Sequence, residues 1–174
     1  MAAQRTPSQT VGPFFHEALR WKEGGNVTFA EPGQRIVVSG RVIDGAGEPV
    51  ADALIETWQL SPLGKTPAAA TGDARPHGFG RVETGKDGSF RIETSMPGGD
   101  APCLEVSFFS RGLLKGLRTR VYFAAEDRVR ADPVLNAIAG SPRVKTLIAQ
   151  AAGGNQYRWD VRLQGEGETV FFAV

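Results

Sequence analysis

The segment 101–123 constrains the fold more than any other stretch of the chain, because its side chains alternate in character before a single turn. Residues two apart share one face of a β-strand, so this alternation predicts a strand with one buried face. Before the turn at Arg111-Gly112, one face carries Cys103, Glu105 and Ser107, and the other carries Leu104, Val106 and Phe108. The segment therefore predicts two buried strands joined by this turn.

Turn residues recur along the whole chain, with 22 Gly and 11 Pro in 174 residues. Between the turns, further strands are expected at 36–43, 53–60, 157–163 and 169–174, and 80–94 has the pattern of a hairpin that turns at 86–88. Short strands at regular spacing predict an all-β fold, a β-sandwich of about eight strands with short helices. The sandwich domain is expected to span 36–174, after an irregular N-terminal arm at 1–35.

Two short helices are expected in the second half of the chain. Asp132 precedes Pro133, and Ser141 precedes Pro142, which are typical N-cap and first-turn pairs. Apolar residues at helical spacing then predict that the second helix continues to the stop at 153–154.

Charge and cysteine content exclude several function classes. Lys and Arg number 20 against 19 acids, so no general basic field favours nucleic acid. One cysteine rules out an internal disulfide, and the N-terminus lacks the apolar core of a signal peptide. The expected location is cytoplasmic.

Cys103 and Glu105 occupy positions where two side chains of one strand could reach the same ion. A metalloenzyme strand places a His-x-His pair there, since imidazoles on one face can share a metal. Here the sequence is Cys-Leu-Glu, and the chain has only two histidines, His16 and His77, both outside the central strands. Cys103 is expected to be a small buried side chain, and Glu105, if buried, needs an arginine on a neighbouring strand.

Five segments together resemble the intradiol ring-cleavage dioxygenases. They are TPSQTVGPFFH, GRVIDGAGEPVADALIETWQ, FFSRGLLKGLRTRVYF, DPVLNAI and YRWDVRLQGEGETVFF, and they cover nearly the whole chain in order. The resemblance implies a sandwich fold and an iron held by two tyrosinates and two histidines. By motif, these ligands fall at Thr66, in the turn 97–100, and at Cys103 and Glu105, so none of the four is present. These positions are expected to form a vestigial site that holds no metal.

The resemblance also implies a partner. In the heteromeric members of this family, a β subunit holds Fe(III) and an α subunit of the same fold supplies part of the cavity wall. The expected role is that of the α subunit, in a higher hetero-oligomer that acts on a small aromatic substrate and O2. No catalytic residue is expected on this chain, and the substrate-lining positions by motif are Thr10, Gly12, Pro13 and Arg111.

Other interpretations stay open at this level. The stretch from Thr10 to Pro13 fits an ordinary turn that anchors a terminal arm, and Arg111 fits a solvated turn residue. The middle motif also occurs in transthyretin-like sandwiches, which would make the chain a non-catalytic binding or structural module. A self-sufficient dioxygenase with unusual ligands is the third hypothesis.

Overall fold

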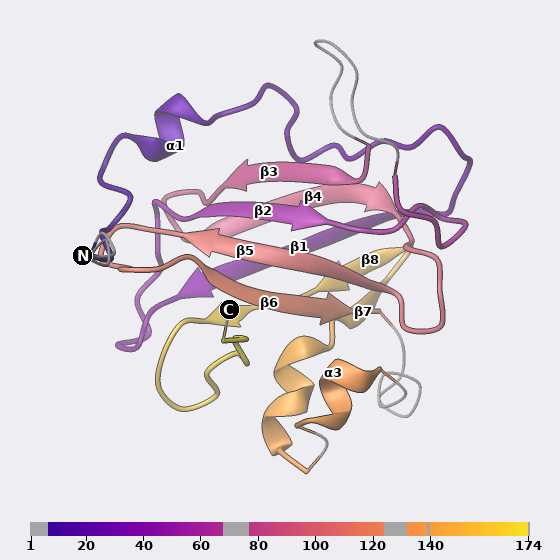
Figure 1. Cartoon of the computed structure of the whole chain (residues 1–174). Coiled ribbons are helices and arrows are strands. Elements are labelled where there is room, and N and C mark those ends of the chain that lie inside the picture. Colours follow the sequence, from indigo (N-terminus) through magenta and orange to yellow (C-terminus); the bar gives the residue numbers. More distant parts are fainter. Residues whose placement is uncertain (1–6, 68–76, 124–131, 139, 174) are drawn as a thin grey trace, which may run out of the picture.

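The structure is a computed structural model that describes residues 7–67, 77–123, 132–138 and 140–173. Among these residues, a pair of sheets face each other across a shared apolar core, so the predicted β-sandwich is confirmed (Figure 1). One sheet has the order β4-β1-β8-β7 with β9 also paired to β1, and the other has the order β3-β2-β5-β6.

The elements are short, as the turn signals predict. The strands are β1 (Arg35–Ile43), β2 (Leu54–Trp58), β3 (Phe79–Glu83), β4 (Ser89–Ser95), β5 (Cys103–Phe109), β6 (Leu117–Tyr122), β7 (Gln150–Gly153), β8 (Gln156–Arg158) and β9 (Val161–Arg162). The helical turns are α1 (Phe15–Ala18), α3 (Pro133–Asn136) and the 3-10 helix η1 (Pro142–Leu147).

The two strands predicted at 101–123 are β5 and β6, which pair antiparallel with Glu105 opposite Arg120. β5 lies inside its sheet, but β6 is the last strand in the order, so it is not central. Burial along β5 alternates as expected, with Leu104, Val106 and Phe108 buried and Glu105 exposed. Trp159 closes the core between the sheets, with ring centroids 6.1 Å from Phe108. The pleat of β5 therefore sends its polar face outward, where a site can form.

The predicted hairpin at 80–94 is wrong. Its turn forms, since Gly88 N donates to Gly85 O at 2.8 Å, but β3 pairs with β2 and β4 pairs with β1 in the opposite sheet. The segment 24–27 lies between their edges. Arg81 N donates to Gly24 O at 2.9 Å, and Glu93 N donates to Gly25 O at 2.6 Å. The arm thus takes the hydrogen bonds that a hairpin would have formed.

Two further expectations at the C-terminal end are also wrong in extent. Both N-caps are confirmed, because Asp132 accepts from Val134 N and Ser141 accepts from Arg143 N. The second helix, however, ends at Leu147. The chain then adopts an extended conformation, because Ala149 N donates to Tyr122 O at 2.9 Å. Of the strand expected at 169–174, the described residues 169–173 form only a single bridge, between Phe172 and Arg118, and residue 174 lies outside the described residues.

The described part of the N-terminal arm, from residue 7 onward, is irregular apart from α1, which lies on the β3 side of the molecule (Figure 1). Its second half is anchored: Val27 is 1% exposed in the core, and Trp21 packs edge-on against Phe79 at 5.2 Å. Within the described chain, no helix has the length and apolar character needed to cross a membrane.

Candidate functional site

The structure brings together the three positions that are predicted to form a vestigial metal site. Thr66, Cys103 and Glu105 line one cavity of about 400 Å³ at the N-terminal end of β5. Its other lining residues are Trp58, Gln59, Leu60, Pro67, Ala101, Arg120 and Asp132. The alternation of β5 explains the geometry, because Cys103 and Glu105 are two residues apart and so face the same side.

Arg120 is the central charge of this cavity. Its Nη2 donates to Glu105 Oε1 at 2.9 Å, and its Nη1 donates to Asp132 Oδ2 at 3.3 Å. Tyr122 also donates its hydroxyl to Asp132 Oδ2, at 3.0 Å. The expected arginine partner of Glu105 is therefore confirmed, although the Glu105 side chain is 61% exposed. Sequence patterns predicted Asp132 only as a helix cap, and nothing local indicated its ionic role.

Burial shifts both weak acids of the cavity toward their neutral forms. Burial raises the pKa of the Cys103 thiol to about 11, with Asp132 and Glu105 adding to the rise and Arg120 opposing it. Burial likewise raises the pKa of the Tyr122 phenol above its usual value, although Arg120 pulls it down. At neutral pH the thiol and the phenol are thus protonated.

The residues around this cavity do not fit a ferric ion. Ferric iron prefers hard anionic oxygen and imidazole donors, whereas here a guanidinium lies between the two carboxylates. Among the described residues, no three His, Cys, Asp or Glu side chains come together as a metal-binding group. Of the histidines, His16 lies in α1, and His77 lies in a loop with Nδ1 3.3 Å from Thr28 O.

A second group of predicted residues lies in the arm and in the turn after β5. Gly112 N donates to Thr10 Oγ1 at 3.1 Å, which joins the arm to the turn. Gly112 has φ +83° and Gly12 has φ +77°, in the left-handed region that side chains with a Cβ rarely adopt. Thr10, Pro13 and Arg111 are exposed, so this group faces outward.

Asp52 is a member of this group that sequence patterns missed. One of its carboxylate oxygens accepts from Ser110 Oγ at 3.2 Å, and the other accepts from Nε of Arg111. Asp52 precedes β2, and the pairing of Leu54 with Phe109 brings the two ends side by side. Only the β2–β5 register predicts this contact, because the partners are 59 positions apart.

The two groups occupy opposite ends of the same strand pair. Leu54 pairs with Phe109 beside Asp52 and Arg111, and Trp58 pairs with Glu105 beside the cavity. Since a strand rises about 3.3 Å per residue, Cys103 and Arg111 are on the order of 20 Å apart or more. The chain does not bring Thr10 or Arg111 to its own vestigial cavity.

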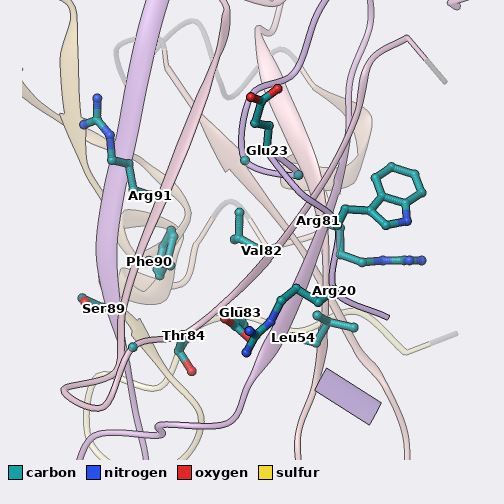
Figure 2. A pocket seen from close by; sticks show the side chains of 14 residues that line it. Arg20, Glu23, Leu54, Arg81, Val82, Glu83, Thr84, Ser89, Phe90 and Arg91 are labelled. Atoms are coloured by element: carbon teal, nitrogen blue, oxygen red, sulfur yellow. The ribbon is translucent and has the colours of Figure 1, made fainter. Parts of the chain in front are cut away.

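A larger cavity, of about 650 Å³, lies elsewhere, at the edge where β3 and β4 diverge (Figure 2). Figure 2 shows Val82 and Phe90 in its interior and charged side chains around it. The arginines that line it are already ion-paired: Arg20 with Glu83, Arg81 with Glu56, and Arg91 with Glu93. None of the predicted site residues lines this cavity, and it forms where β3 and β4 enter different sheets.

The chain is similar to known proteins over most of its length. A family model described as dioxygenase matches residues 11–165. The chain is 40% identical to the protocatechuate 3,4-dioxygenase alpha chain of Burkholderia cepacia, over 98% of both chains. It is 38% identical to the alpha chain of the same name from Pseudomonas putida, over 96% of this chain and 95% of that one. The beta chain from Burkholderia cepacia is 27% identical, over 93% of this chain and 77% of the relative.

Proposed function

The chain belongs to the intradiol dioxygenase family, and from this premise we propose that it is the iron-free alpha subunit of a protocatechuate 3,4-dioxygenase. The assembled enzyme cleaves 3,4-dihydroxybenzoate with O2, between the two hydroxylated carbons, to 3-carboxy-cis,cis-muconate. The family is iron-dependent, and in this proposal Fe(III) belongs to the beta subunit. The alpha subunit then contributes fold support, an interface and part of the cavity that orients the substrate.

The observation that carries the proposal is that Arg120 forms ion pairs with Glu105 and Asp132 in the cavity where the family motif predicts metal ligands. A cavity whose two carboxylates are bound by a guanidinium, and whose third candidate donor is a soft thiol, offers no ferric ligand set. Near-full-length similarity to alpha chains supports the assignment of this chain as the alpha subunit. A self-sufficient dioxygenase needs donors that this cavity lacks, and a transthyretin-like module does not account for the alpha-chain similarity of the arm.

The proposed substrate contacts are Thr10, Gly12, Pro13 and Arg111. Two observations support them: the hydrogen bond from Gly112 N to Thr10 Oγ1 places the arm on the Arg111 turn, and Arg111 has a side chain that is 62% exposed. A guanidinium matches a carboxylate in shape and charge, which suits the ring carboxylate of 3,4-dihydroxybenzoate. In the same proposal, residues 1–35 are the arm and 36–174 are the sandwich. The first half of the arm reaches the partner, since residues 24–27 pair with the sandwich of this chain.

The first test is production of the chain alone and together with a beta chain. The iron content, the colour and the oxygen consumption with 3,4-dihydroxybenzoate are then measured for each preparation. We expect iron, a red colour and activity only in the complex. Iron and colour in the isolated chain, or no complex with a beta chain, would contradict the proposal.

The second test is Arg111→Ala in the assembled enzyme. The change removes a charged hydrogen-bonding group, so the KM for 3,4-dihydroxybenzoate is expected to rise about tenfold or more. The KM for catechol, which lacks the carboxylate, is expected to change little. Equal effects on the two substrates would remove the carboxylate-binding role of Arg111.

A further inference from the structure

Beyond the residues of the proposed cavity wall, Asp52 has an arrangement that a surface ion pair does not require. Its carboxylate bridges two consecutive residues, with one oxygen on Ser110 Oγ and the other on Nε of Arg111. The Asp52 side chain is 18% exposed, and that of Arg111 is 62% exposed. The carboxylate therefore holds the inner part of the arginine from below the surface and leaves its outer end exposed.

The atom that Asp52 uses determines what Arg111 can still bind. A guanidinium has five N–H donors, and Nε carries one of them. With Nε held by Asp52, the two Nη groups remain as an end-on fork on the exposed part of the side chain. Such a fork matches the two oxygens of a carboxylate. An arginine fixed at Nε also loses less rotamer freedom when that carboxylate arrives.

The turn is held on its other side as well. Ser110 is 3% exposed, and Gly112 N donates to Thr10 Oγ1 at 3.1 Å. The backbone on both sides of Arg111 is thus fixed by Asp52 and by the arm, so the remaining freedom lies in the arginine side chain. Asp52 restricts that freedom directly.

We propose that Asp52 is a positioning residue that aims the guanidinium of Arg111 at the carboxylate of the aromatic substrate. This inference rests on the proposed function, because it acts through Arg111. Asp52 itself does not contact the substrate. Its negative charge also weakens the attraction of Arg111 for an anion, so the gain from orientation has to exceed that electrostatic loss. The two effects have opposite signs in a binding measurement, which makes the proposal testable.

The experiment uses the assembled enzyme with Asp52→Ala and Asp52→Asn, and it measures KM for 3,4-dihydroxybenzoate and for catechol. Both variants are expected to raise the KM for 3,4-dihydroxybenzoate relative to the KM for catechol about three- to tenfold. This is less than the effect of losing a charged hydrogen bond to the substrate itself, because Asp52 acts only through Arg111. Asparagine keeps an acceptor for Ser110, so it maintains the fold if alanine does not. An unchanged ratio overturns the proposal. A lower ratio also overturns it, because it would mean that the negative charge of Asp52 weakens substrate binding more than the positioning of Arg111 strengthens it.

The matched control is Asp87→Ala. Asp87 also pairs with an arginine, Arg41, at 3.2 Å, and holds a turn by accepting from Ser89, but it lies in the turn between β3 and β4. Its loss is expected to lower stability without changing the KM ratio. A similar change in the ratio for Asp87→Ala would mean that the Asp52 effect is merely structural, and would overturn the proposal.

A double variant separates this inference from the proposed function. If Asp52 acts through Arg111, then Asp52→Ala adds nothing to the KM ratio in an Arg111→Ala background. Additive effects overturn the positioning role while Arg111 keeps its own. If Arg111→Ala alone leaves the ratio unchanged, the carboxylate-binding function itself fails.

Discussion

Replacing Arg120 with methionine tests whether the guanidinium stabilises the vestigial cavity. Methionine keeps most of the aliphatic length of arginine, so packing along the stem is largely retained while the charge is lost. Asp132, whose side chain is 11% exposed, then loses its ion pair and keeps the Tyr122 hydroxyl and the N–H of Val134. The carboxylate of Glu105 is 61% exposed and is solvated instead.

The magnitude follows from these exposures. Removing one partner of a buried ion pair costs about 3–5 kcal/mol, and the cost is smaller here because Arg120 is 25% exposed and Asp132 retains two donors. Loss of the exposed Glu105 pair adds at most about 1 kcal/mol. We therefore expect a loss of about 2–3 kcal/mol in the free energy of unfolding, which corresponds to a Tm lower by roughly 5–10 °C.

The assay is urea unfolding of the purified chain, followed by tryptophan fluorescence, with two companion variants. Arg118→Met changes an exposed arginine of the same strand and is expected to fall within about 0.5 kcal/mol of the original protein. Asp132→Asn, added to Arg120→Met, removes the unpaired charge and should recover about 1 kcal/mol or more. If Arg120→Met costs no more than Arg118→Met, the reasoning is refuted.

The remaining predictions concern three positions, Cys103, Gly40 and Gly112. Because burial raises the pKa of Cys103 to about 11 from an ordinary 9.0, iodoacetamide should alkylate it roughly a hundredfold more slowly than a free thiol at pH 8. The unfolded thiol loses its proton first, so this group should also lower stability as the pH rises above 9.0, as urea unfolding at several pH values would show. Gly40→Ala should prevent soluble expression, since its Cβ would lie 1.7 Å from the carbonyl oxygen of Trp159, whereas Gly140→Ala meets nothing within 4 Å and should leave the yield unchanged. Gly112→Ala forces a side chain into φ +83°, and should lower the free energy of unfolding by about 1–2 kcal/mol in the same urea assay.

Features that depend on neighbouring residues could be predicted from the sequence. The alternation in β5 follows from its own side chains, and the caps at Asp132 and Ser141 follow from contacts two residues away. The pairing of strands could not be predicted in the same way. The pattern at 80–94 is typical of a hairpin, but the two strands enter different sheets because residues 24–27 pair with both of their edges.

The same difference between local patterns and strand pairing determines how much of the candidate site could be predicted. The vestigial positions follow from motif and strand period, so Cys103 and Glu105 were predicted to share a face, and they line one cavity. The residues that determine its charge, Arg120 and Asp132, meet only because β6 pairs with β5 and α3 folds back against it. Long-range ion pairs of this kind depend on register, and a single sequence carries no local signal for them.

The β2–β5 register also limits which chain can use Arg111. It places Asp52 and Arg111 at the Leu54–Phe109 end of the strand pair and the cavity at the Trp58–Glu105 end. Extended strands keep these two ends apart, so one bound substrate cannot contact both. Any substrate that contacts Arg111 therefore lies outside the vestigial cavity of this chain. The surface at that end is open and exposed, so a closed cavity there requires walls from another chain. In the proposed function, a partner is therefore needed both for the iron and for the other walls of the cavity at Arg111.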